Sequence, residues 1–486
     1  MTVIAKQKIL PECKKNAAGA PVLLPWLIKG CLLAHKDLPK ILHFDKAYDD
    51  GIFNPFWRMQ MERKFFNFHG LPFSTMLTVI SSFLSRLGRA AIEDLIDVKN
   101  SSPFHYKLRF SDASECEQEK MAKEETYILP KSYPMVGGDG PYSYAKNSVF
   151  QKTIVDCAKE MVTEGIVEKL DLQSLGFKNS CTFRIADLGC SVGPNTFIAV
   201  QNIIEAVEQK YQAENKNPST MEFQVFFNDL DINDFNTLFK TLPPDREYFA
   251  AGVPGSFRNR LFPKSSLHIV HCSTTLHWLS KIPDEIVDSK SPAWNKGSIH
   301  CNGFAKEVVE AYSAQFKNDM NSFFNARAKE LVPGGLMLIL ISTVPDGVPA
   351  SNTFEGMHYD FLGSCLYDMA KMGLISEEKL DSFNLSLYFP FYGEFEALIR
   401  RNENFTIERM DKFTNPTRKM VSSAEFYSSH MRAGFEGLVK EHFGDQFVEP
   451  IFNYYSTKLE ENIGSILDAE IHDKIELLVL LKRNTN

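Results

Sequence analysis

The segment of this 486-residue chain whose residues best suit chemistry is 187–195, with the sequence DLGCSVGPN. An apolar run ends at Asp187, Gly189 and Gly193 follow, and a helical pattern then begins. This order is typical of a strand, a turn and a helix that bind a ligand. The third glycine of the fingerprint G-x-G-x-x-G is missing, which disfavours a nicotinamide dehydrogenase. An acid before the first glycine suits a positively charged ligand such as S-adenosylmethionine and would repel a pyrophosphate. A tight turn with a solvated Asp187 is the alternative.

A second acid, Asp229, directly follows the next predicted strand. A carboxylate at that position can accept hydrogen bonds from both hydroxyls of a ribose. It lies farther from Asp187 than the usual spacing of about 20 residues, and the polar insert 212–220 accounts for part of the excess. Taken alone, Asp229 is more typical of a helix cap, because Asp231 and Asp234 follow closely.

Strands and helices alternate along the part of the chain that would position these residues. Buried strands are predicted at 182–188, 223–227, 266–272, 336–342 and 475–482, and amphipathic helices at 147–172, 196–211 and 305–331. This alternation predicts right-handed crossovers and a parallel α/β sheet covered by helices on both faces. A ligand of such a sheet lies beyond the carboxyl ends of the strands, where the strand order reverses.

The first 126 residues differ from the rest. Residues 1–110 carry a net positive charge and are rich in Phe and Trp, and 111–126 have the composition of a polar linker. We expect 1–126 to be an N-terminal extension of unknown role with its linker, and 127–486 to be a separate domain. A transit peptide is disfavoured, because such peptides avoid acidic residues like Asp45 and Asp49.

The composition excludes several classes of protein. With 44% hydrophobic and 23% charged residues, the chain is neither disordered nor a disulfide framework, and a net charge of −8 argues against nucleic-acid binding. Its nine cysteines are scattered, and no apolar run approaches the roughly 18 residues that a membrane span needs. We therefore expect a cytoplasmic protein without a membrane span.

A series of ordered motifs carries a family resemblance. The motifs are GGDGPYSYAKNS at 137–148, IADLGCSVGPN at 185–195, VPGSF at 253–257 and LHWLS at 276–280. In these motifs the chain resembles the plant SABATH methyltransferases, which use S-adenosylmethionine to methylate small acids and xanthine alkaloids. The segments LGSCL at 362–366, SEEK at 376–379 and DSFN at 381–384 are most similar to the branch that contains loganic acid and farnesoic acid methyltransferases.

The resemblance covers about 132–486 and implies a Rossmann-like class I methyltransferase sheet with a mostly helical, substrate-binding cap. The cap would come from 343–391 and 421–433. Its aromatic and Met side chains are candidates for lining the acceptor pocket: Tyr359, Phe361, Tyr388, Phe389, Phe391, Tyr427 and Met431. At helical spacing such residues more often belong to a core.

The resemblance also implies a set of cofactor contacts: Tyr144, Ser148, Asp187, Gly189, Cys190, Asn195, Asp229, Leu230, Ser256 and Phe257. In this set Tyr144 would cover the methyl donor and Phe257 would stack on the adenine, although both also fit the role of core aromatics. Some relatives carry Mg²⁺ at positions that match Asn295, Asp381, Phe383 and Asn384. Oxygen ligands of this kind suit a hard cation, and a turn with a helix cap is the alternative.

A carboxylic acid is the acceptor that the resemblance favours. Its reference pKa is near 4, so at neutral pH it is ionised and needs no general base. The enzyme would then align a carboxylate with the methyl carbon by hydrogen bonds from the Gln151 amide and the Trp278 indole, with His277 as a further donor or a packed histidine. Tyr144 would join these residues in contacting the acceptor.

Two other functions stay open. One is an N-methyltransferase of purine-like alkaloids on the same fold. The other is a non-catalytic small-molecule binder that uses the N-terminal extension for interactions. Members of the family often pair, so a homodimer is expected alongside the small-molecule acid as a partner.

Overall fold

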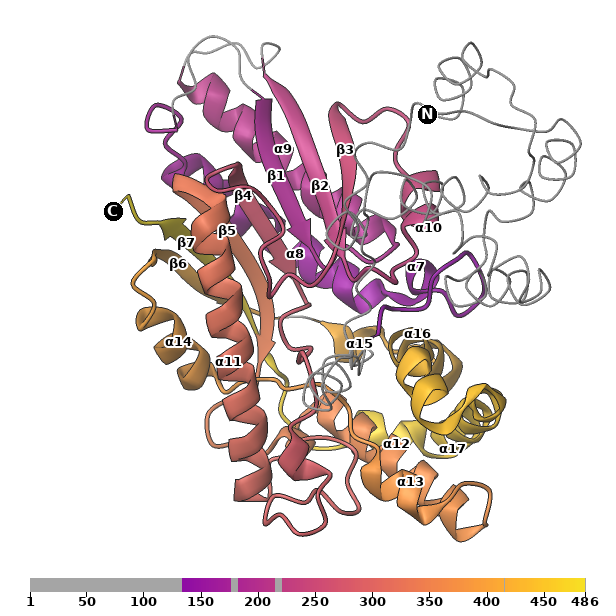
Figure 1. The fold of residues 1–486 in the computed structure, drawn as a ribbon. Coiled ribbons are helices and arrows are strands. Elements are labelled where there is room, and N and C mark those ends of the chain that lie inside the picture. Colours follow the sequence, from indigo (N-terminus) through magenta and orange to yellow (C-terminus); the bar gives the residue numbers. More distant parts are fainter. Residues whose placement is uncertain (1–132, 176–181, 215–220, 415, 486) are drawn as a thin grey trace, which may run out of the picture. The chain divides into compact units, whose positions relative to one another are not determined.

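The computed structural model describes residues 133–175, 182–214, 221–414 and 416–485 (Figure 1). The chain divides into two units, Met1–Glu125 and Thr126–Asn486, and every described residue belongs to the second unit. The predicted extension at 1–126 and the predicted domain start at 127 lie outside the described residues.

Within the described residues, seven strands form one sheet in the order β3-β2-β1-β4-β5-β7-β6 (Figure 1). The strands are β1 (Thr182–Leu188), β2 (Glu222–Asp229), β3 (Tyr248–Pro254), β4 (Leu267–Ser273), β5 (Leu331–Thr343), β6 (Phe405–Phe413) and β7 (Ile475–Arg483). Neighbours from β3 to β5 pair in parallel, and β7 pairs antiparallel with both β5 and β6. The strand order reverses between β1 and β4, so a ligand is expected beyond these two strands.

The prediction of a parallel sheet is confirmed for β1, β2, β4 and β5 and is wrong for the last strand. A strand buried on both faces is an apolar run in either direction, so the sequence of β7 does not reveal its orientation. The strands β3 and β6 were not predicted. They form the two edges of the sheet and are only partly buried, so they lack the apolar pattern of the central strands.

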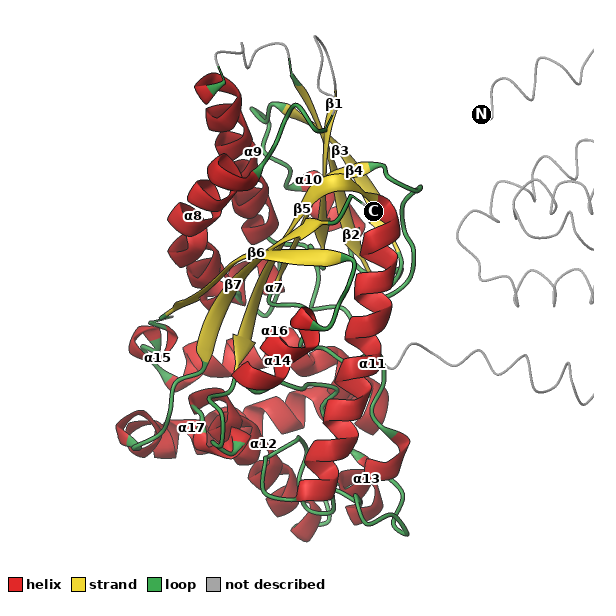
Figure 2. Cartoon of the chain, turned by 90° about the vertical axis from the view of Figure 1, so that its left-hand side faces the viewer, coloured by secondary structure: helices red, strands yellow, loops and turns green. Residues whose placement is uncertain are grey.

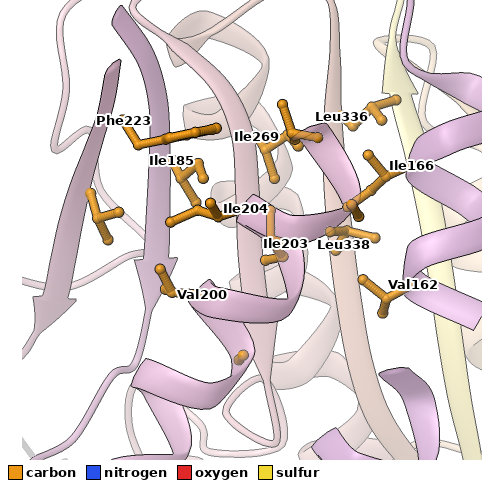
Figure 3. Close-up of a cluster of buried hydrophobic side chains, with 14 of the residues drawn as sticks. Val162, Ile166, Ile185, Val200, Ile203, Ile204, Phe223, Ile269, Leu336 and Leu338 are labelled. Atoms are coloured by element: carbon orange, nitrogen blue, oxygen red, sulfur yellow. The ribbon is translucent and has the colours of Figure 1, made fainter. Parts of the chain in front are cut away.

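Helices cover both faces of the sheet (Figure 2). On one face lie α8 (Val149–Lys169) and α9 (Pro194–Ala213), whose apolar side chains, among them Ile166 and Val200, pack on the strands (Figure 3). On the other face lies α11 (Lys306–Glu330), which buries a row of phenylalanines. The predictions of helices at 147–172, 196–211 and 305–331 are confirmed, and the ends differ by at most three residues.

A third apolar cluster builds a helical cap at the end of the sheet toward which β5 runs (Figure 1). Its main helices are α12 (Phe354–Lys371), α13 (Glu377–Ser382), α16 (Ala424–Phe443) and α17 (Val448–Asp468). Three of them begin where a hydroxyl side chain, that of Thr353, Ser376 or Ser423, accepts a hydrogen bond from the first turn. The predicted cap segments contain α12, α13 and the first half of α16, and the structure adds α17.

Short helices complete the described residues. They are α7 (Tyr144–Asn147), α10 (Phe235–Lys240), α14 (Tyr392–Arg400), α15 (Thr417–Met420) and the 3₁₀ turns Asp284–Ile286, Ala350–Asn352 and Asp445–Phe447. No helix in the described part of the chain combines the length and the apolar character that crossing a bilayer requires.

Candidate active site

The loop between β1 and α9 brings its backbone to the edge of a cavity. Gly189 has a φ of +81°, and a Cβ atom at this position would collide with the side chain of Thr275. The N–H groups of Gly189 and Cys190 donate to the carbonyl of Asn228 at 2.8 and 2.9 Å, which fixes the loop against the end of β2. Glycine is therefore needed here both for the backbone conformation and for the close approach.

Asp187 lies behind this loop and is not among the residues that line the cavity. It is 4% exposed, and its Oδ1 lies 2.6 Å from His271 Nδ1. Its Oδ2 accepts a short hydrogen bond from the Thr196 hydroxyl, in the first turn of α9. The carboxylate thus ties β1 to β4 and α9, and its negative charge acts on the cavity from behind the loop.

Asp229, at the end of β2, does line the cavity. Its Oδ2 accepts a hydrogen bond from the N–H of Ser191 at 2.7 Å, and its Oδ1 accepts one from the N–H of Leu230 at 2.8 Å. Burial raises the pKa of Asp229 to about 6, which outweighs the lowering by these two hydrogen bonds. The carboxylate retains acceptor sites toward the cavity and is held in a fixed position, as ribose recognition requires.

Two aromatic residues, Tyr144 and Phe257, line the cavity together with Asp229. Burial and the charges of Asp229 and Asp187 raise the pKa of Tyr144, so its hydroxyl stays protonated. Phe257 is 8% exposed, and its ring lies edge to face with Phe323, with centroids 6.0 Å apart. Both residues line the cavity, as contacts of a cofactor would.

The ten residues expected to contact the cofactor divide into two groups. Five line the cavity: Tyr144, Gly189, Asp229, Leu230 and Phe257. The other five lie outside its lining: Ser148, Asp187, Cys190, Asn195 and Ser256. Within the second group, the Asn195 amide donates to the Ser148 hydroxyl at 2.9 Å and to its carbonyl at 3.0 Å, which joins the start of α9 to the start of α8.

The three residues expected to orient the acceptor line the same cavity, whose volume is about 170 Å³. The Oε1 atom of Gln151 is buried and has no hydrogen-bond partner among the described residues. Trp278 packs on Phe435, with centroids 5.8 Å apart. His277 stacks on Phe389 at 4.7 Å, and burial lowers its pKa to about 3, so it is neutral at physiological pH. Gln151 therefore brings to the cavity a buried side-chain oxygen that lacks a donor, and the NH₂ group of the same amide is the part that could donate to an acceptor.

The predicted aromatic lining of the cap is present in part. Four of the seven residues border the cavity: Tyr359, Phe389, Tyr427 and Met431. Two others, Tyr388 and Phe391, border a small adjoining cavity that shares Tyr359 and Phe389 with the first, and the remaining one, Phe361, packs against Tyr455.

Sequence reasoning missed a polar group in this cavity, formed by Ser342, Glu355, Lys474 and Glu476. In a parallel sheet the ligand lies beyond the ends of strands, whereas β7 runs antiparallel and brings its beginning to the same edge. Two charged residues within two positions of each other, directly before a run of leucines, were the available signal. Lys474 is buried, which lowers its pKa, and its Nζ atom lies 3.6 Å from Glu355 Oε2.

The residues expected to hold Mg²⁺ are only partly suited to it. The Asn295 amide donates to Asn384 Oδ1 at 2.7 Å and to the carbonyl of His300 at 3.0 Å, so these oxygens already have donors. The Phe383 side chain packs on Phe443. Among the described residues, no group of three His, Cys, Asp or Glu side chains could hold a metal ion. A site built from one carboxylate, amide oxygens and a backbone carbonyl is of another kind, so Mg²⁺ at Asn295, Asp381, Phe383 and Asn384 stays a prediction.

A solved structure titled "Loganic acid methyltransferase with SAH" has the same fold, with a TM-score of 0.69 and 48% sequence identity. The match covers 73% of this chain and 99% of the other. The strand order, the glycine loop after β1 and the acid after β2 therefore define an α/β methyltransferase.

Residues 130–484 match the family model described as "SAM dependent carboxyl methyltransferase". The chain is 48% identical to loganic acid O-methyltransferase of Catharanthus roseus, over 73% of this chain and 95% of that protein. It is 46% identical to farnesoic acid carboxyl-O-methyltransferase of Arabidopsis thaliana, over 73% of this chain and all of that protein. The chain belongs to the S-adenosylmethionine-dependent carboxyl methyltransferases, the SABATH family predicted from its motifs.

Proposed function

We propose that this protein transfers a methyl group to the carboxylate of a small terpenoid, iridoid or hormone-like acid and so forms a methyl ester. The two relatives named for loganic acid and farnesoic acid support this class of acceptor. The observation that carries the proposal is that Gln151 and Trp278 line the same cavity as Asp229. Neutral N–H donors next to the cofactor residues suit an acceptor that is already an anion.

The cavity residues Tyr144, Gly189, Asp229 and Phe257 fit S-adenosylmethionine, which supplies a methyl group on a positively charged sulfur. Asp229 would accept hydrogen bonds from the ribose hydroxyls, and Phe257 would pack against the adenine. The backbone at Gly189 can approach the cofactor closely because it carries no Cβ atom. Tyr144 stays protonated and would cover the methyl donor.

The acceptor needs positioning and no deprotonation. A carboxylic acid is ionised at neutral pH, so the Gln151 amide and the Trp278 indole N–H have only to hold a carboxylate oxygen in line with the methyl carbon. His277 cannot contribute a positive charge, because its pKa is lowered to about 3. Its role in this proposal is to donate or accept one hydrogen bond beside the acceptor.

Exclusion of water contributes as well. The acceptor part of the cavity is lined by aromatic side chains that include Phe150, Tyr359 and Phe389. Methyl transfer from a cation to an anion neutralises both charges, and a site of low polarity favours a reaction of this kind.

The proposal is tested with a panel of acids and a cofactor that is isotopically labelled in its methyl group. The panel holds loganic, farnesoic and jasmonic acids, with xanthine as the nitrogen acceptor. We expect a labelled product that alkaline hydrolysis returns to the acid, which identifies a methyl ester. A label that survives alkali on a xanthine nitrogen, or no transfer to any acid, would contradict the proposal.

Three finer expectations belong to this proposal. Residues 127–486 act as the methyltransferase domain, the protein works in the cytoplasm, and two chains pair as a homodimer. Sedimentation of the purified chain measures its mass in solution and tests the pairing, and a fluorescent fusion in plant cells tests the location.

A further inference from the structure

The beginning of β7 places charged residues at the acceptor end of the cavity. Side chains alternate along a strand, so Glu476 and Leu478 share one face of β7, and Lys474 directly precedes the strand. Farther along β7 and β5, that face is built of leucines packed under α8 and α9. It becomes polar at Ser342, which pairs in register with Glu476, and this is where the strands reach the cavity.

The contacts of Lys474 leave hydrogen-bonding capacity toward the cavity. Its Nζ atom lies 3.1 Å from the centroid of the Phe389 ring and 3.6 Å from Glu355 Oε2, which is longer than a hydrogen bond. Glu355 Oε2 accepts no hydrogen bond from the described residues. Glu476, in contrast, accepts one from the Ser342 hydroxyl at 2.7 Å. Lys474 and Glu355 therefore form a loose ion pair, and both line the cavity with hydrogen-bonding capacity left over.

A buried ion pair contributes little to the stability of a core. Taking both charges out of water costs more than a loose contact returns, and apolar residues of similar volume often serve as well. The long separation of Lys474 and Glu355 is therefore better explained by a third group that completes their hydrogen bonds. A molecule in the cavity, which both side chains line, is placed to supply that group.

We propose that Lys474 and Glu355 determine specificity by binding neutral hydroxyl groups on the acceptor, away from the carboxylate that is methylated. This inference rests on the proposed function. A hydroxyl accepts from the ammonium and donates to the carboxylate, so it satisfies both. A second anionic group is disfavoured, because Glu355 and Glu476 outnumber Lys474 in charge. A hydrocarbon end would leave both charges buried without partners.

The test compares loganic acid, which carries hydroxyls on its sugar, with farnesoic acid, whose chain is hydrocarbon. The kcat/KM ratio of the two acids is measured in the full-length protein and in the double variant Glu355→Gln/Lys474→Met, which preserves net charge and approximate volume. The difference in size between the two acids is the same in both proteins, so it cancels when their kcat/KM ratios are compared. We expect the kcat/KM for loganic acid, divided by that for farnesoic acid, to fall at least tenfold in the double variant because the KM of loganic acid rises. The affinity for SAH should stay unchanged.

The matched control is Lys458→Met/Glu461→Gln, which removes an exposed ion pair of 2.8 Å on α17 by the same substitutions. It should leave the ratio as it is in the unaltered protein. If the double variant unfolds, the single variant Glu355→Gln, which keeps the lysine and the shape of the site, is measured in its place. A ratio within twofold of the unaltered protein overturns the inference, whereas failure to esterify any acid of the panel contradicts the proposed function instead.

Discussion

At the residue scale, the proposed function assigns recognition of the acceptor to Gln151, which carries no charge. A hydrogen bond to a charged group contributes roughly 1.5–3 kcal/mol, so Gln151→Ala should lower kcat/KM for the acid about tenfold or more. The loss should appear as a higher KM and a slower turnover. SAH affinity, measured by calorimetry, should stay the same.

The control for this variant is Gln201→Ala, on the exposed face of α9. It removes the same amide from a position outside the cavity, so its kinetics should match those of the unaltered protein. Unchanged kinetics in Gln151→Ala would show that the amide does not hold the acceptor.

The raised pKa of Asp229 predicts that cofactor affinity depends on pH. With a pKa of about 6, the carboxyl is ionised at pH 7.5 and mostly protonated at pH 5.5, and the protonated form loses acceptor sites for the ribose. The dissociation constant of SAH should therefore rise about fourfold as the pH falls from 7.5 to 5.5.

Asp229→Asn isolates this effect, because an amide does not titrate in this range. The variant should bind SAH more weakly at every pH and should lose the part of the pH dependence that Asp229 causes. The same fourfold change in the Asn variant would assign the dependence to another group or to the ligand.

The sequence alone predicted that Asp229 and the glycine loop follow two neighbouring strands, because apolar runs end directly before them, whereas their role in binding the cofactor came from the family resemblance. Gln151 and Trp278 came from the family resemblance, since an isolated Gln or Trp is compatible with many roles. The position of Asp187 behind the loop could not be predicted. It depends on a hydrogen bond from His271, which is far away in the sequence and adjacent only through the pairing of β1 with β4.

At the scale of elements, the β1–α9 turn depends on the absence of a side chain at Gly189. Gly189→Ala places a Cβ atom against Thr275 at a φ of +81°, and a left-handed conformation alone costs an L-residue roughly 1–2 kcal/mol. We expect a lower free energy of unfolding in urea, by about this amount or more, together with weaker SAH binding.

Gly464→Ala is the matched substitution, because Gly464 lies within α17 and a Cβ atom there meets nothing within 4 Å. Alanine favours a helix over glycine, so this variant should gain about 0.5–1 kcal/mol of stability. Equal effects of the two substitutions would mean that the conformation of Gly189 is not required.

The central elements could be predicted because their apolar periods are complete. The strand β1 and the helices α9 and α11 bury whole faces, so their sequences carry the period of the fold. The edge strands β3 and β6 bury less and carry a weaker pattern. The direction of β7 is a property of the sheet and is not encoded in its own residues.

At the scale of the whole molecule, every described element of the sheet, the cap and the cavity lies between residues 133 and 485. The family match spans 130–484. We therefore predict that a chain of residues 127–486 folds and methylates its acid with the kcat/KM of the full chain. Circular dichroism checks folding, and the methyl-transfer assay checks activity. A folded but inactive shortened chain would assign a catalytic role to residues 1–126.

The place of β7 has a consequence for how the protein is made. Its neighbour β6 precedes it in the chain but pairs only with β7 within the described sheet. During synthesis β6 therefore has no strand to pair with until α16, α17 and β7 have left the ribosome. A sheet that depends on such late, distant pairing is exposed to aggregation while it waits, and the acceptor end of the pocket is the last part of the enzyme to form.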